Sequence, residues 1–146
     1  QRGKATSVDH LFVYGTLLTN ARDSLGAAMR ARLQREARLI GTASVPGRLY
    51  DLGDYPGFVE APPRGARDLV AGEVLQLHDA TATFDWLDLY EDVDRVDPTA
   101  GLYRRVPQLA LLDTADAVRC WLYVLNQIPA DAVVIDGGSW LSRKAF

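Results

Sequence analysis

The sequence is poor in cysteine and histidine, the residues that most often cross-link a small fold or bind transition metals. Cys120 is the only cysteine, so the chain cannot form an internal disulfide. A single thiol is typical of proteins in reducing compartments, and we therefore expect a cytoplasmic location. The two histidines, His10 and His78, fall on different predicted elements and lack the spacing of a zinc site. The sequence therefore predicts no metal centre.

The chain also lacks an excess of positive charge, long apolar runs and phosphate-binding glycine motifs. Its 19 Asp and Glu residues outnumber its 16 Lys and Arg residues, which gives a net charge of −3. Nucleic-acid binders carry strongly basic surfaces, so we expect no nucleic-acid partner. No apolar run reaches the roughly 18 residues of a membrane helix, and no segment of the signal-peptide type opens the sequence, so we expect no membrane partner. Neither of the common nucleotide-binding glycine motifs is present.

The composition suits one domain with a sizeable core, because the 146 residues are 48% hydrophobic and 24% charged. We expect a single domain over residues 1–146, with the polar residues 1–7 frayed. Short β-prone apolar runs and apolar residues at helical spacing predict the elements. The predicted strands cover residues 10–14, 38–45, 69–77, 103–112 and 117–125, with shorter extended segments at 49–52 and 58–59. The predicted helices run from 23 or 24 to about 36, and from 79 or 81 to about 91.

Glycine and proline indicate where these strands bend or end. Pro46-Gly47 predicts a turn after residues 38–45. Gly72 predicts a bulge within residues 69–77, and Pro107 places residues 103–112 at a sheet edge or at another bulge. Because few βαβ repeats occur, five or six short strands with two main helices indicate an α+β fold with a strongly curved or barrel-like sheet.

Glu91 is conspicuous because it falls on the apolar side of the second predicted helix. At about 100° per residue, it lies between Phe84 and Leu87 on the helical wheel. The opposite, solvent-facing side carries three aspartates, Asp85, Asp88 and Asp92. Burial raises the pKa of a carboxyl group and suits it to proton transfer near neutral pH, so Glu91 is a candidate general acid/base. Two alternatives stay open: Glu91 closes the helix and pairs with Arg104 or Arg105, or the helix ends before it.

A second candidate is the segment Tyr14-Gly15-Thr16-Leu17, which directly follows a buried strand. Gly15 allows a tight backbone turn that exposes N–H groups, and such groups bind anions or a developing oxyanion. A strand that ends in Gly-Thr is also the ordinary sequence of a simple turn. The segment therefore indicates a binding site only in combination with other motifs.

Several short motifs follow one another along nearly the whole chain. They are residues 12–17 (FVYGTL), 47–53 (GRLYDLG), 55–57 (YPG), 72–74 (GEV), 87–91 (LDLYE), 103–106 (YRRV), 121–123 (WLY) and 138–140 (GSW). In this order the motifs resemble the γ-glutamylcyclotransferase-like family, including its γ-glutamylamine cyclotransferase branch. The resemblance implies a small mixed β-barrel of five or six strands flanked by two main helices, with a pocket at the barrel mouth and no metal or organic cofactor.

The resemblance also implies a reaction and the residues that perform it. The α-amine of a small γ-glutamyl substrate attacks its own γ-carbonyl, which yields 5-oxoproline and a free amine or amino compound. Glu91 would serve as the general acid/base. Backbone N–H groups of residues 15–17 would stabilise the oxyanion, Tyr14 and Tyr50 would line the pocket, and Tyr103 would orient Glu91.

The acidic segment 92–102 is longer than in many relatives, so the resemblance does not identify the γ-glutamyl donor. Two other functions stay open. One is a non-catalytic module that keeps the pocket to bind a small acidic ligand. The other is a hydrolase or amidotransferase that uses the same carboxyl group and releases free glutamate. The sequence leaves the oligomeric state open.

Overall fold

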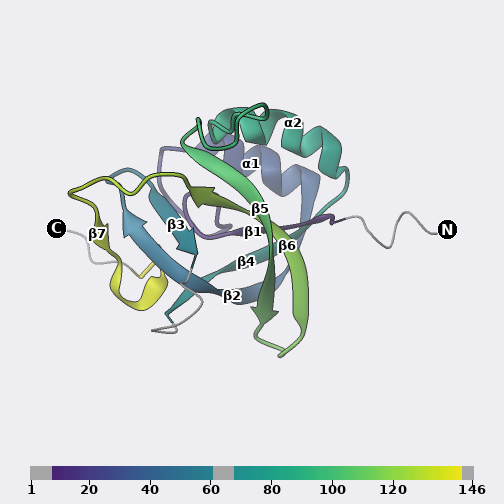
Figure 1. The fold of residues 1–146 in the computed structure, drawn as a ribbon. Helices are drawn as coiled ribbons and strands as arrows, with labels where there is room; N and C mark the ends of the chain where they lie inside the picture. Colours follow the sequence, from purple (N-terminus) through teal and green to yellow (C-terminus); the bar gives the residue numbers. More distant parts are fainter. Residues whose placement is uncertain (1–7, 61–67, 143–146) are drawn as a thin grey trace.

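The computed structural model describes residues 8–60 and 68–142, so the segment 1–7, predicted to be frayed, lies outside the described residues. Figure 1 shows the arrangement of the elements in the described part. In chain order these are β1 (His10–Val13), α1 (Ala27–Glu36), β2 (Ala37–Asp51), β3 (Pro56–Glu60), β4 (Leu69–Leu77), α2 (Ala80–Tyr90), β5 (Tyr103–Leu112), β6 (Ala117–Leu125), β7 (Val133–Val134) and the short 3-10 turn η2 (Asp136–Gly138).

Five of the strands close into a mixed barrel in the order β2-β4-β1-β6-β5 (Figure 1). β1 runs parallel to β6, and the other neighbouring strands of the ring are antiparallel. The ring closes where Ala43 and Ser44 of β2 stand opposite Leu112 and Leu111 of β5. β3 and β7 pair with β2 outside this ring. The α+β barrel with two helices that the family resemblance implied is therefore confirmed.

The predicted turn at Pro46-Gly47 is wrong, because β2 continues through both residues. Pro46 is the last residue of β2 to pair with β4, opposite Leu69. Gly47 is the first to pair with β3, opposite Glu60. Proline has no N–H to donate to a ladder, and a Cβ at Gly47 would stand 2.5 Å from the Phe58 ring. The Pro-Gly pair therefore marks a change of partner strand and not the end of the strand.

The predicted bulge at Gly72 is also wrong. Gly72 stands opposite Ala43 in a continuous register, and the irregularity lies in β2 between Leu39 and Gly41. A Cβ at Gly72 would lie 2.2 Å from the Val13 carbonyl oxygen and 2.5 Å from the Phe12 ring, so glycine here allows β1 to approach β4 closely.

The core fills the barrel and the space between the barrel and the two helices, which lie on the same side of it (Figure 1). Leu11 and Phe12 are neighbours in β1 and point to opposite faces, yet their exposed fractions are 0% and 1%. This agrees with the prediction that a buried strand precedes the segment 14–17. Leu33 of α1 and Leu87 of α2 are equally buried and belong to the part of the core between the barrel and the helices.

The first helix begins at Ala27, three or four residues later than predicted. The residue before it, Gly26, has a φ of 82°. A Cβ there would stand 2.9 Å from Thr16 Oγ1 and 3.0 Å from the Tyr90 hydroxyl. Glycine therefore allows the segment before α1 to pack between the turn after β1 and the end of α2.

Candidate active site

A cavity of about 220 Å³ opens where the end of β1, the end of α2 and the start of β5 meet. Its lining residues are Phe12, Val13, Tyr14, Gly15, Thr16, Leu17, Leu25, Tyr55, Pro56, Tyr90, Glu91, Leu102, Tyr103 and Tyr123. The structure therefore brings together six of the seven site residues predicted from sequence. The seventh, Tyr50, is absent from this lining. Tyr50 lies in the part of β2 beyond the barrel, opposite Gly57 and Val134. A different tyrosine, Tyr55, lines the cavity.

The turn after β1 forms part of the cavity wall. Gly15 has to be glycine, because a Cβ would lie 2.6 Å from the ring of Pro56. The turn closes with a hydrogen bond of 3.0 Å from Leu18 N–H to Gly15 C=O. Within residues 8–60 and 68–142, the N–H groups of Gly15, Thr16 and Leu17 find no acceptor. Three amides without an acceptor, in one turn that lines the cavity, are suited to bind an anion or an oxyanion.

Two charged side chains hold this turn in place. Arg30 of α1 donates to the carbonyl oxygens of Thr16, at 2.5 Å, and Asp23, at 3.0 Å. Glu73 of β4, only 6% exposed, accepts the Thr19 N–H at 2.9 Å and the Thr19 hydroxyl at 2.7 Å. Neither residue is among the site residues predicted from the sequence. The sequence could have indicated Glu73, because it is a single carboxylate within an apolar predicted strand. No local sequence pattern distinguishes Arg30 as a functional residue.

The end of α2 fixes the position of Glu91, which is the C-cap residue. The next residue, Asp92, has a φ of 57°. Its N–H donates to Leu89 C=O at 3.2 Å, and Val93 N–H donates to Asp88 C=O at 2.9 Å. This pair of bonds is the Schellman termination of a helix, with aspartate in the left-handed position that glycine usually takes. These two hydrogen bonds therefore fix the backbone that carries Glu91 at the cavity wall.

The carboxyl group of Glu91 has an unusual electrostatic setting. No described residue donates a hydrogen bond to it or forms an ion pair with it. Burial, and then the negative charge of Asp88, raise the pKa of Glu91 to about 8. Arg104 pairs with Glu60 at 3.1 Å, and Arg105 pairs with Asp88 at 2.9 Å. The alternative in which Glu91 pairs with one of these arginines is therefore wrong.

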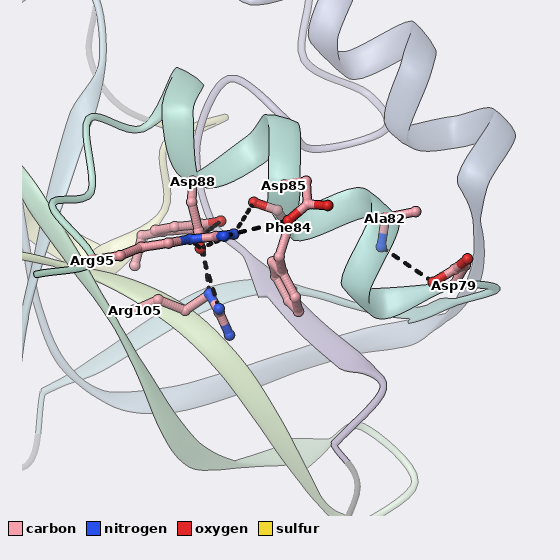
Figure 2. A network of polar contacts seen from close by, with 8 residues as sticks. Asp79, Ala82, Phe84, Asp85, Asp88, Arg95 and Arg105 are labelled. Atoms are coloured by element: carbon pink, nitrogen blue, oxygen red, sulfur yellow. Dashed lines mark hydrogen bonds and ion pairs between the residues drawn. The ribbon is translucent and has the colours of Figure 1, made fainter.

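Asp88 is buried, at 2% exposure, which corrects the prediction that it faces solvent. Figure 2 shows it between Arg95 and Arg105. Arg105 Nε lies 2.9 Å from Asp88 Oδ1 and Arg95 Nη2 lies 3.0 Å from Oδ2, while the Tyr123 hydroxyl donates to Oδ1 at 2.7 Å. Burial raises the pKa of Asp88, but the hydrogen bonds from Arg105, Tyr123 and Arg95 outweigh it, so the net shift is downward. An ionised carboxylate therefore stands one helical turn before Glu91.

The tyrosines of the cavity are held by backbone groups. The Tyr14 hydroxyl donates to Tyr123 C=O at 2.7 Å and accepts the Phe58 N–H at 3.3 Å. The Tyr103 hydroxyl donates to Pro56 C=O at 2.6 Å, so its hydrogen bond goes to the backbone and not to Glu91. These residues therefore offer ring surface to a ligand, and their hydroxyls stabilise the cavity wall.

The described residues contain no feature of a metal site or a membrane helix. No group of three or more histidine, cysteine, aspartate or glutamate side chains in residues 8–60 and 68–142 is placed to hold a metal ion. Neither helix of the described chain has the length and apolar character that crossing a bilayer requires.

Comparison with known proteins identifies the family. The family model described as "Gamma-glutamyl cyclotransferase, AIG2-like" matches residues 11–142. The chain belongs to this family. A curated protein of Vibrio cholerae, named "Putative gamma-glutamylcyclotransferase", is 33% identical over 139 residues, which cover 93% of this chain and 99% of that protein.

Two solved structures share the fold of this chain. The solution structure of protein ytfP from Escherichia coli is 30% identical, with a TM-score of 0.59, and the match covers 91% of this chain and 96% of that one. The crystal structure of an aig2-like protein from Mus musculus is 21% identical, with a TM-score of 0.62, and the match covers 94% and 85% of the two chains. The mouse protein supports the fold alone.

Proposed function

We propose that this family member is a cyclotransferase that converts a γ-glutamyl amine or γ-glutamyl amino compound to 5-oxoproline and the free amine, with Glu91 as the general acid/base. The substrate's α-amino nitrogen forms a bond to its own γ-carbonyl carbon, and the bond from that carbon to the leaving nitrogen breaks. The α-amine loses a proton and the leaving nitrogen gains one. The reaction therefore balances without water, a metal or a redox cofactor.

The observation that carries this proposal is a carboxyl group with a pKa of about 8 in the same cavity as three free amides. Near neutral pH, a group with this pKa is present in both protonation states. It is therefore able to accept the proton of the attacking amine and return it to the leaving amine. Such proton transfer is typically worth about 10²–10⁴-fold in rate.

The turn of residues 15–17 supports the same proposal. A tetrahedral intermediate carries negative charge on the former carbonyl oxygen, and preorganised N–H donors stabilise that charge most strongly in a site that excludes water. The cavity of about 220 Å³ is small and favours a folded γ-glutamyl group whose amine lies close to its own carbonyl. The proposal thus combines proton transfer, oxyanion stabilisation and proximity.

A cytoplasmic location stays a prediction. The one cysteine, Cys120, is buried and unpaired in a strand, which fits a reducing compartment.

The test is to incubate the protein with γ-glutamyl amines, γ-glutamyl amino acids and γ-glutamyl-lysine and to quantify 5-oxoproline and glutamate. Glu91→Gln is the test variant. Glu60→Gln is the matched control, because Glu60 is exposed and does not line the cavity. We expect 5-oxoproline from the wild type and from Glu60→Gln, and none above background from Glu91→Gln.

Other results would support the alternatives. Free glutamate in place of 5-oxoproline would indicate a hydrolase. Thermal stabilisation by 5-oxoproline, without turnover of any donor by the folded protein, would indicate a binding module. Undiminished 5-oxoproline formation by Glu91→Gln would mean that another group is the base.

A further inference from the structure

One peptide of the turn after β1 is held by a cation. Arg30 Nη1 donates to the Thr16 carbonyl oxygen at 2.5 Å, and this carbonyl belongs to the same peptide unit as the Leu17 N–H. The peptide bond is trans, so its C=O and its N–H point in opposite directions. The bond to Arg30 therefore also fixes the direction of the Leu17 N–H, which points away from the guanidinium.

The charge of Arg30 makes this amide a stronger donor than its neighbour. A hydrogen bond to an ionised group is roughly twice as strong as a neutral one, and linked hydrogen bonds polarise one another. The Thr16 N–H lacks this help, because the carbonyl of its peptide unit, that of Gly15, accepts the neutral Leu18 N–H. No carboxylate of the described residues forms an ion pair with Arg30, so a salt bridge does not neutralise its positive charge.

Arg30 is itself held by the segment before α1. Its Nη2 donates to the Asp23 carbonyl oxygen at 3.0 Å. The Asp23 carboxylate in turn accepts the Trp140 Nε1–H at 3.3 Å, from a residue 117 positions away in the sequence. We call Trp140, Asp23 and Arg30 the positioning series. It connects the C-terminal part of the chain to the peptide that carries the Leu17 N–H.

Trp140 gives the positioning series a rigid end. Its exposed fraction is 0%, and it is the largest of the fully buried side chains in the described part of the chain. The segment before it is fixed to the barrel, because Ile135 N–H donates to Leu49 C=O of β2 at 2.7 Å. Gly138 has a φ of 66° and lies so close to β4 that a Cβ there would clash with the Leu69 carbonyl oxygen. The indole N–H of Trp140 therefore has a set position relative to the barrel.

On the basis of the proposed function, we propose that Trp140 and Asp23 are positioning residues for the reaction. Through Arg30 they hold the Leu17 N–H as the principal donor to the oxyanion. Charge on that oxygen develops only as the transition state and the tetrahedral intermediate form, so a misaligned donor lowers kcat and hardly changes KM. A role in stability alone would lower the melting temperature and leave kcat of the folded protein unchanged.

Trp140→Phe is the test variant, because it keeps a buried ring and removes the indole N–H. Trp86→Phe is the matched control, since the Trp86 Nε1–H also donates to a carboxylate, that of Glu36, at 2.9 Å. Neither tryptophan lines the cavity. With the donor that the wild type converts fastest, we expect kcat for 5-oxoproline formation to fall about three- to tenfold in Trp140→Phe, with little change in KM. In Trp86→Phe, kcat should stay within about a factor of two of the wild type.

A second variant tests the same series from its middle. Asp23→Ala removes the carboxylate that Trp140 binds and keeps the backbone carbonyl that Arg30 binds. It should reproduce the fall in kcat, and it carries the test alone if thermal melts show that Trp140→Phe is unfolded at the assay temperature.

A double-mutant cycle shows whether Trp140 acts through Arg30. If it does, Trp140→Phe combined with Arg30→Met should be as slow as Arg30→Met alone, within about a factor of two, whereas independent effects would multiply. Multiplied effects, a wild-type kcat in both Trp140→Phe and Asp23→Ala, or an equal fall in Trp86→Phe would overturn the inference and leave the proposed function intact. No 5-oxoproline from the wild type with any donor of the panel would remove the proposed function, and this inference with it.

Discussion

Replacing Glu91 by glutamine should change how the stability of the protein depends on pH. The folded state raises the pKa of Glu91 from 4.5 to about 8, so it holds this proton more tightly than the unfolded chain does. Between these pH values the unfolded chain releases the proton first, and the free energy of unfolding therefore falls as pH rises. At about 1.36 kcal/mol per pKa unit, the loss amounts to roughly 3–5 kcal/mol.

Glutamine cannot ionise, so Glu91→Gln should lack this loss. We expect its stability relative to the wild type to increase steadily from pH 5 to pH 8.5, by several kcal/mol in total. Urea unfolding followed by fluorescence of the three tryptophans measures the difference at each pH. Glu60→Gln removes an exposed carboxylate paired with Arg104 and should show a nearly constant difference. Parallel pH curves for the wild type and Glu91→Gln would refute the idea that burial keeps this carboxyl protonated.

Three further variants test the supports of the site. Asp88→Asn leaves two arginines without their buried partner and should lower the free energy of unfolding by roughly 3–5 kcal/mol, which thermal melts will show. Because Glu91 loses a negative neighbour, its pKa should fall, and pH–rate profiles should show the midpoint of activity shifted toward acid. Gly101→Ala places a Cβ against Asp92 C=O and should lower stability by about 1–3 kcal/mol in urea unfolding, whereas Gly41→Ala meets only a side-chain carbon at 3.6 Å and should be nearly neutral. Arg30→Met frees the turn after β1 and should lower kcat/KM roughly tenfold with a much smaller effect on melting; an equal loss of stability and activity would contradict a role in positioning the turn.

Local sequence signals located the strands because each apolar run is bounded by turn residues. The predicted ranges 69–77, 103–112 and 117–125 coincide with β4, β5 and β6. The second helix was also placed closely, since Asp79 caps it by accepting the Ala82 N–H at 3.1 Å (Figure 2). The partner change at Pro46-Gly47 was missed because a proline at a strand junction has the same local signature as a turn.

The site was only partly accessible from sequence, because its supports come from distant segments. The helical wheel placed Glu91 toward the interior, and the structure places it in the cavity wall. The wheel placed Asp88 in solvent, since it takes no account of β5 and β6. Arg105 of β5 packs its guanidinium 3.9 Å from the Phe84 ring and 4.4 Å from the Trp121 ring, and thereby covers that side of α2. Only the three-dimensional arrangement reveals this cover.

The most direct test of the account compares 5-oxoproline formation from γ-glutamyl-isobutylamide by the wild type and by Glu91→Gln at pH 8, with the released isobutylamine measured in parallel. We predict that the wild type forms 5-oxoproline and amine in equal amounts and that the variant is slower by about 10²–10⁴-fold while remaining folded. A variant with a rate within a factor of about ten of the wild type would contradict the assignment of Glu91 as the general acid/base.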